Sequence, residues 1–286
     1  MRNIADTLRE AITSIGDILA LDPTASRIEA QCLLQHVLSV PRVYLLAHPE
    51  QTLSEVQRDA FDALLQRRLR GEPIAHLLGE REFFGLNLKV SPATLIPRPD
   101  TELIVELALN RIPHAQPYRV LDMGTGSGAI ALAIAKHKPN IEVVAVDASR
   151  DALAVAIENA GRLDIPNVHF MQSDWFSALN GQHFDLIVSN PPYISSGDIH
   201  LSQGDLRFEP LTALASGADG LDDIRRIISA APQYLTSNGW LLLEHGYDQA
   251  GSVRDLLTQR GFVEVSSEKD LAGIERVTGG KLPDSK

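Results

Sequence analysis

From residue 118 onward the chain alternates short apolar runs with amphipathic stretches, and this alternation restricts its fold more than any other feature. Apolar runs bounded by turn residues predict strands, and apolar residues at three- and four-residue spacing predict helices. The alternation favours an α/β fold with a doubly wound, mostly parallel sheet. The last two predicted strands have no helix between them, which indicates an antiparallel addition at one edge. The expected strands are 118–123, 142–146, 168–171, 185–189, 240–244, 263–266 and 274–278, and the expected helices are 129–136, 151–162, 221–235 and 249–259.

Residues 1–71 show helical periodicity and no strand pattern, so we expect a small all-helical N-terminal domain. Ser54 followed by Gln57 fits a capping box at the start of its last long helix, and Gly71 fits the end of that helix. The helices expected here contain residues 4–15, 28–38, 43–47 and 54–70.

Residues 72–98 do not show a helical pattern. Glycines and prolines occur around an alternating apolar run at 83–90. This pattern predicts a strand or hairpin that links the helical domain to a larger domain, residues 99–286. Three nearby prolines keep the chain extended up to Asp100, which we expect to cap a helix over 101–109.

The charge balance argues against a protein that holds nucleic acid mainly by its phosphates. Lys and Arg number 26 against 37 Asp and Glu, a net charge of −11, and no long basic run occurs. The N-terminus has no apolar signal region and no stretch of about 18 apolar residues occurs, so we expect a cytoplasmic protein without a membrane segment. The single cysteine, Cys32, and the lack of a ligand cluster give no reason to expect a metal site.

A glycine-rich loop at 124–128 lies between the first predicted strand of the sheet and the following helix. Glycines there allow a tight turn and leave room for a ligand. Asp147 ends the next strand, where a carboxylate can accept both hydrogen bonds of a ribose diol. This pair predicts a nucleoside cofactor but does not choose it, because the loop also satisfies the dinucleotide pattern G-x-G-x-x-A. The candidate cofactor-binding residues are Gly124, Thr125, Gly126, Ser127, Gly128 and Asp147.

Two details favour a sulfonium cofactor over NAD. Asp122 stands two residues before the first glycine of the loop, where a carboxylate would meet a cation. Asp174 and Trp175 follow the third strand, and they can hydrogen-bond an exocyclic amine and cover a purine face. Trp175 also has a simpler interpretation as a core aromatic residue.

The strand at 184–189 runs directly into Asn190-Pro191-Pro192-Tyr193, the most specific signal in the chain. The two prolines remove N–H donors, so the loop presents carbonyl groups. The Asn190 side-chain oxygen and the Pro191 carbonyl would accept the two hydrogens of an NH2 group, and Tyr193 would cover a planar substrate. We therefore expect Asn190, Pro191 and Tyr193 to be catalytic, the whole loop to bind substrate, and Asn190 to contact the cofactor as well.

The glycine loop, Asp147 and the Asn-Pro-Pro-Tyr loop together resemble the class I S-adenosylmethionine-dependent methyltransferases that alkylate planar amides or amines. DNA methyltransferases acting on adenine N6 and RNA methyltransferases acting on guanine N2 share such a loop. The loop therefore indicates the chemistry and not the substrate.

Further segments resemble the peptide chain release factor N5-glutamine methyltransferases, the HemK/PrmC family, over essentially the whole chain. They are GEPIAH at 71–76, GEREFFG at 79–85, LIPRPDTE at 95–102, RFEP at 207–210, GADGL at 217–221 and KDLAG at 269–273.

This resemblance implies a Rossmann-like, seven-stranded methyltransferase domain that uses S-adenosyl-L-methionine. It implies methylation of the glutamine side-chain amide in the Gly-Gly-Gln motif of class 1 release factors, which act in translation termination. It also places the loop 124–128 at the methionine part of the cofactor, Asp147 at the ribose, Asp174 and Trp175 at the adenine, and residues 98–101 in a lid.

Two alternatives remain at this point. A nucleic-acid amino-methyltransferase would need a basic groove, yet the first 80 residues hold eight arginines against eleven acidic residues. A binding module without activity is the other, and the intact glycine and Asn-Pro-Pro-Tyr loops disfavour it. We expect no direct nucleic-acid substrate and a docking role for the helical domain.

Overall fold

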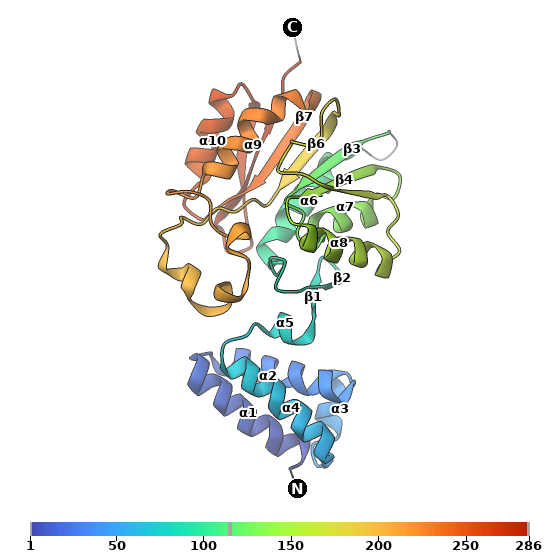
Figure 1. Ribbon diagram of the computed structural model, residues 1–286, viewed down its shortest axis with the longest axis vertical. Coiled ribbons are helices and arrows are strands. Elements are labelled where there is room, and N and C mark those ends of the chain that lie inside the picture. Colours follow the sequence, from blue (N-terminus) through green and yellow to red (C-terminus); the bar gives the residue numbers. More distant parts are fainter. Residues whose placement is uncertain (1, 114–115, 285–286) are drawn as a thin grey trace. The chain divides into compact units, whose positions relative to one another are not determined.

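The computed structural model describes residues 2–113 and 116–284, and the chain divides into two compact units, Met1–Glu80 and Arg81–Lys286 (Figure 1). Sequence alone placed the end of the helical domain at residue 71. The structure adds the short helix α5 (Ile74–Leu78) to the N-terminal unit, and its five residues are too few to show a helical period.

The N-terminal unit is all-helical and has a hydrophobic core of its own, drawn from residues 4–77. Its helices begin where the sequence supplies caps: the Asn3 side chain accepts from the backbone N–H of Asp6, and Ser54 and Gln57 form the expected capping box of α4. Besides α5, the unit contains the helices α1 (Ile4–Leu19), α2 (Pro23–Leu38), α3 (Arg42–Ala47) and α4 (Glu55–Leu69).

A hairpin follows, as expected, with strands β1 (Glu80–Phe83) and β2 (Leu86–Lys89) paired in a two-stranded sheet. The expected cap at Asp100 is wrong. Pro99–Thr101 forms a single 3-10 turn, and α6 (Glu102–Arg111) begins only after it, because the proline favours a tight turn before the helix can start.

The main sheet has seven strands in the order β5-β4-β3-β6-β7-β9-β8, which confirms the expected doubly wound, mostly parallel α/β fold. The first five strands in this order run parallel, whereas β9 is antiparallel to both its neighbours. The final strand of the chain therefore lies inside the sheet rather than at its edge. The strands are β3 (Arg119–Met123), β4 (Glu142–Asp147), β5 (Val168–Gln172), β6 (Phe184–Ser189), β7 (Leu235–Glu244), β8 (Val263–Lys269) and β9 (Glu275–Lys281).

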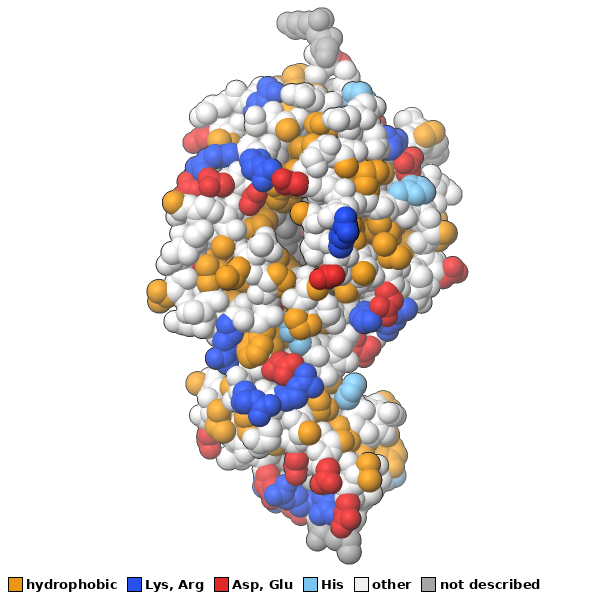
Figure 2. All heavy atoms as spheres, in the orientation of Figure 1, with side chains coloured by type: hydrophobic (Ala, Val, Ile, Leu, Met, Phe, Trp, Pro, Cys, Tyr) orange, Lys and Arg blue, Asp and Glu red, His pale blue; other side chains and the backbone are white. Residues whose placement is uncertain are grey.

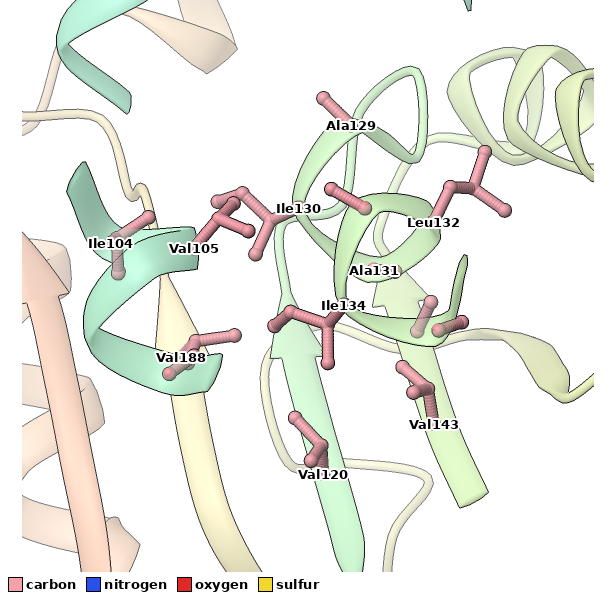
Figure 3. Close-up of a cluster of buried hydrophobic side chains, with 14 of the residues drawn as sticks. Ile104, Val105, Val120, Ala129, Ile130, Ala131, Leu132, Ile134, Val143 and Val188 are labelled. Atoms are coloured by element: carbon pink, nitrogen blue, oxygen red, sulfur yellow. The ribbon is translucent and has the colours of Figure 1, made fainter. Parts of the chain in front are cut away.

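Helices cover both faces of this sheet, and two separate cores result because successive strand residues point to opposite faces. The helices α6 and α7 (Ala129–His137), with α8 (Arg150–Arg162), cover one face, and α9 (Asp222–Ala230) and α10 (Ala250–Gln259) cover the other. Figure 3 shows Ile130 and Ile134 of α7 directed toward α6 and toward the strands that carry Val120 and Val188. Strands β3 and β6 are buried on both faces, so the polar groups that follow them stand at the carboxyl edge of a rigid sheet.

Candidate functional site

The carboxyl ends of β3, β4 and β6 meet at one edge of the sheet, since Met123 pairs with both Val146 and Ser189. A cavity of about 600 Å³ opens at this edge, within the usual size of a small-molecule site. Open parallel sheets bind ligands at such carboxyl ends. Of the sequence-predicted residues, the cavity is lined by Gly124, Thr125, Gly126, Ser127, Asp147, Asp174, Trp175, Asn190 and Pro192. It is not lined by Gly128, Pro191 or Tyr193.

The glycine loop turns through left-handed backbone conformations that only glycine adopts without strain, with φ of +70° at Gly124 and +86° at Gly128. A Cβ at Gly128 would lie 3.0 Å from Leu132 Cδ1 and 3.2 Å from Ala156 Cβ. Gly128 therefore allows α7 and α8 to pack closely behind the loop, while a Cβ at Gly126 would meet no atom within 4 Å. Gly126 leaves open space on the cavity side.

Asp147 lies at the end of β4 with both carboxylate oxygens held by backbone amides. Oδ2 accepts from the N–H of Gly126 at 2.9 Å, and Oδ1 accepts from the N–H of Ser149 at 2.9 Å. Each oxygen has lone pairs to spare, so the oriented carboxylate can accept two further hydrogen bonds from a diol in the cavity.

The sequence suggested that Asp122 would meet a ligand cation, and this expectation is wrong. The Asp122 side chain is fully buried and does not line the cavity. Its Oδ2 accepts from the Thr125 hydroxyl at 2.6 Å and from the backbone N–H of Ala131 at 3.1 Å. The strand alternation turns this side chain toward α7, where it anchors the glycine loop. Burial raises the pKa of Asp122 to about 7, although these two hydrogen bonds oppose the rise.

We expect Asp122→Asn to stabilise the protein increasingly as pH rises. The folded-state pKa of about 7 exceeds the ordinary value of 3.8, so the parent loses stability as pH rises through that window. The asparagine oxygen keeps the two hydrogen bonds without the charge. The melting-temperature difference between variant and parent should grow from about pH 4 to about pH 8. A difference that stays constant with pH would contradict this prediction.

Trp175 lies at the cavity wall in a fixed orientation. Its indole N–H donates to Asp223 Oδ1 at 3.0 Å, and a Cβ at Gly124 would lie 3.6 Å from the indole ring. Trp175 also packs partly against the core on the α9 face, so it lies both in the cavity wall and against the core. Asp174 is exposed and forms an ion pair with Arg226 at 3.1 Å.

The Asn-Pro-Pro-Tyr loop leaves β6 toward the cavity with Asn190 half-buried. The Asn190 amide nitrogen donates to the Thr101 hydroxyl oxygen at 3.2 Å. Tyr193 packs partly against the α9-face core and donates through its hydroxyl to Glu244 Oε1 at 3.4 Å. Burial is the main cause that raises the pKa of Tyr193, so its phenol stays neutral. The backbone carbonyl of Tyr193 accepts from the Gln249 side chain at 3.0 Å, which fixes the end of the loop.

Several further residues that line the cavity were not among the expected site residues, although Leu95, Pro97 and Pro210 belong to the LIPRPDTE and RFEP segments. They come from segments far apart in the chain: Pro92, Ala93, Thr94, Leu95, Pro97, Pro210, Thr212, Ala213, Asp223 and Arg226. The RFEP segment, residues 207–210, holds the cavity residues around Ile96 in place. The buried carboxylate of Glu209 accepts from the backbone N–H of Ile96 at 2.8 Å and from Arg98, so Arg98 fixes the linker and does not line the cavity.

Figure 2 shows Lys and Arg side chains interspersed with Asp and Glu, without one continuous basic surface on the face in view. Among residues 2–113 and 116–284 no cluster of His, Cys, Asp and Glu could hold a metal ion. The helices in the described part of the chain are too short or too polar to cross a membrane.

Comparison with known proteins identifies the family. The PrmC N-terminal domain matches residues 10–79, and the methyltransferase small domain matches residues 101–205. The release factor glutamine methyltransferase of Escherichia coli (strain K12) is 52% identical over 274 residues, which cover 96% of this chain and 97% of that protein. The protein of the same name from Xylella fastidiosa (strain 9a5c) is 50% identical, covering 94% of this chain and 98% of that protein.

The structural comparison agrees at the level of the fold. A solved methyltransferase structure from Pyrococcus furiosus has a TM-score of 0.54 at 18% identity and covers 77% of this chain and 98% of that one. About half of the residues are identical to these relatives over nearly the whole chain, and this similarity covers both units. It is much stronger than the similarity that a shared fold alone produces. The family that the sequence motifs resembled is thereby confirmed, and this chain belongs to the release factor glutamine methyltransferases.

Proposed function

We propose that this enzyme transfers a methyl group from S-adenosyl-L-methionine to the side-chain amide nitrogen, N5, of the glutamine in the Gly-Gly-Gln motif of class 1 peptide chain release factors. The observation that carries this proposal is the Asn-Pro-Pro-Tyr loop, whose Asn190 and Pro192 line a cavity of small-molecule size, in a chain of this family. Family membership supports the substrate, and the loop supports the chemistry.

The cavity residues suit the cofactor. Asp147, with both oxygens oriented by backbone amides, would hold the ribose hydroxyls. The glycine loop would surround the methionine part, and Trp175 would cover the adenine. When bound, the cofactor supplies an electrophilic methyl group on a sulfonium. No protein residue has to activate that group, so the protein needs mainly to position the acceptor.

The acceptor amide is a poor nucleophile because its nitrogen lone pair is delocalised into the carbonyl. We propose that the Asn190 side-chain oxygen and the Pro191 carbonyl accept its two N–H hydrogens and direct the lone pair into the cavity. These two oxygens would also stabilise the positive charge that develops on nitrogen as the new N–C bond forms and the methyl–sulfur bond breaks, which would leave a neutral thioether. One proton then leaves to water. Tyr193 would lie against the amide plane.

We further propose that the enzyme acts in the cytoplasm, where release factors work on ribosomes, and that it has no direct nucleic-acid substrate. The net charge of −11 and the interspersed charges in Figure 2 support the second point. The alternative, methylation of an amino group of DNA or RNA, is tested separately.

The test is mass spectrometry after incubation of the enzyme and cofactor with a purified release factor, and separately with DNA and RNA. We expect one added methyl group on one glutamine of the release factor. Methylation of adenine or guanine without methylation of the release factor would reject the proposal.

The N-terminal unit is proposed to dock the release factor, because the cofactor cavity draws only on residues 92–226 and the helical unit has a core of its own. We expect residues 81–286 alone to bind the cofactor with unchanged affinity but to methylate intact release factor at least tenfold more slowly. Calorimetry and a methylation time course measure the two quantities. Full activity of the truncated enzyme would show that the helical unit is not a docking module.

A further inference from the structure

Four side chains from three separated segments form a hydrogen-bonded group behind the substrate loop. The Asn190 amide nitrogen donates to the Thr101 hydroxyl oxygen at 3.2 Å. Hydrogen bonding by the Thr101 side chain lowers the pKa of the Glu244 carboxyl, and Glu244 Oε1 accepts from the Tyr193 hydroxyl at 3.4 Å. Because β6 pairs with β7 up to Ser189 and Leu243, the residues that follow, Asn190 and Glu244, end neighbouring strands.

Glu244 is expected to destabilise the folded protein at this position. It is 2% exposed, and within residues 2–113 and 116–284 its second oxygen, Oε2, has no hydrogen-bond partner. A buried carboxylate oxygen without a partner destabilises a fold. The nearest charges only partly compensate: Arg276 is favourable but is shared with Asp100 and Asp270, and Asp100 repels the carboxylate. The position of Glu244 is therefore not explained by stability.

The group determines which way the Asn190 amide faces. An ionised carboxylate only accepts hydrogen bonds, so toward Glu244 the Thr101 hydroxyl can act only as a donor. The Thr101 oxygen is then left with lone pairs alone toward Asn190, and it must meet the NH2 end of that amide. The other end, Oδ1, is thereby free to accept from a substrate.

From this geometry we propose that Glu244 is a positioning residue, which acts through Thr101 to present the Asn190 oxygen to the substrate amide and holds the Tyr193 hydroxyl at the same time. The inference rests on the proposed function, since it assigns a second layer of residues to the same amide-binding loop. Without the carboxylate, the Thr101 hydroxyl can rotate and donate to Asn190, and the amide can turn its NH2 group toward the substrate.

Burial raises the pKa of Glu244 to about 7, against the hydrogen bonds from Thr101 and Tyr193. Measurements at about pH 8 therefore keep the carboxyl mainly ionised in the parent enzyme.

The decisive variant is Glu244→Gln, which keeps the size but adds an NH2 donor that can point at Thr101. We expect kcat for release-factor methylation to fall at least tenfold, with unchanged cofactor affinity and an unchanged or higher melting temperature. In the NMR spectrum, the Asn190 side-chain amide hydrogens, assigned by their loss in Asn190→Ala, should lose protection from solvent exchange. A residue with only a structural role would instead lower stability and activity together.

Thr101 supplies a second variant that leaves Glu244 in place. Thr101→Val replaces the hydroxyl by a methyl group and should lower kcat by a similar factor, whereas Thr101→Ser should restore it to within threefold of the parent. The matched control is Thr236→Val, because the Thr236 hydroxyl also donates to a carboxylate, Asp185 Oδ1 at 2.9 Å, at the opposite end of β7. This control should leave kcat unchanged.

The parent enzyme in the same assay separates the inference from the proposed function. If the parent does not methylate the release factor, the proposed function fails. If the parent is active and Glu244→Gln retains kcat within threefold, or loses activity in step with its melting temperature, the positioning role is wrong. If Glu244→Gln does not fold, equal activity of Thr101→Val and Thr101→Ser overturns the inference by itself.

Discussion

Asn190→Ala is expected to lower the rate of glutamine methylation by about 10²–10³-fold while cofactor affinity changes little. The variant removes the oxygen that would accept one N–H of the substrate amide, so the nitrogen lone pair is no longer aimed into the cavity. The residues proposed to hold the cofactor, Asp147 at the end of β4 and the glycine loop after β3, are unchanged in this variant. Single-turnover methylation of a release factor gives the rate, and calorimetry gives the cofactor affinity.

Asn190→Asp refines this test because it keeps an acceptor oxygen but loses the N–H that meets Thr101. If acceptance alone matters, the aspartate variant should retain more activity than the alanine variant. A rate for Asn190→Ala within about threefold of the parent would mean that the loop is only a rigid turn.

Asp147→Ala is expected to weaken cofactor binding about a hundredfold, or roughly 2–3 kcal/mol, through the loss of two hydrogen bonds to a diol. The variant also leaves the backbone N–H groups of Gly126 and Ser149 without their acceptor, which adds to the loss. Asp147→Asn keeps one oxygen and should fall between alanine and the parent. Unchanged affinity by calorimetry, in a variant with parental circular dichroism, would exclude Asp147 as the ribose ligand.

Most strands and long helices of the larger unit could be predicted because their apolar periods are clear, as in the buried runs of β3, β4 and β6. The helix expected over 221–235 is too long, because α9 ends at Ala230 and β7 already begins at Leu235. The order of the last two strands could not be predicted. Periodicity says that a strand is buried but does not name its neighbours, so nothing in residues 275–281 places them between β7 and β8.

The location of the cavity was predictable where a short motif follows a strand, since residues 124–127, Asn190 and Pro192 all line it, although Gly128, Pro191 and Tyr193 do not. It was not predictable where the fold brings in residues that lie in no motif, such as Asp223 and Arg226. Asp122 shows a further limit. Its place in the sequence beside the glycine loop suggested ligand contact, whereas the direction of its side chain from the strand turns it into the core behind that loop.

The insertion of β9 between β7 and β8 also imposes an order on folding during synthesis. Strand β7 emerges from the ribosome well before β9, and β8 is made before it has any partner in the sheet, because β9 contributes the pairing to both. A nascent chain of this protein therefore holds one edge of β7, and the whole of β8, unpaired until residues 275–281 have left the ribosome.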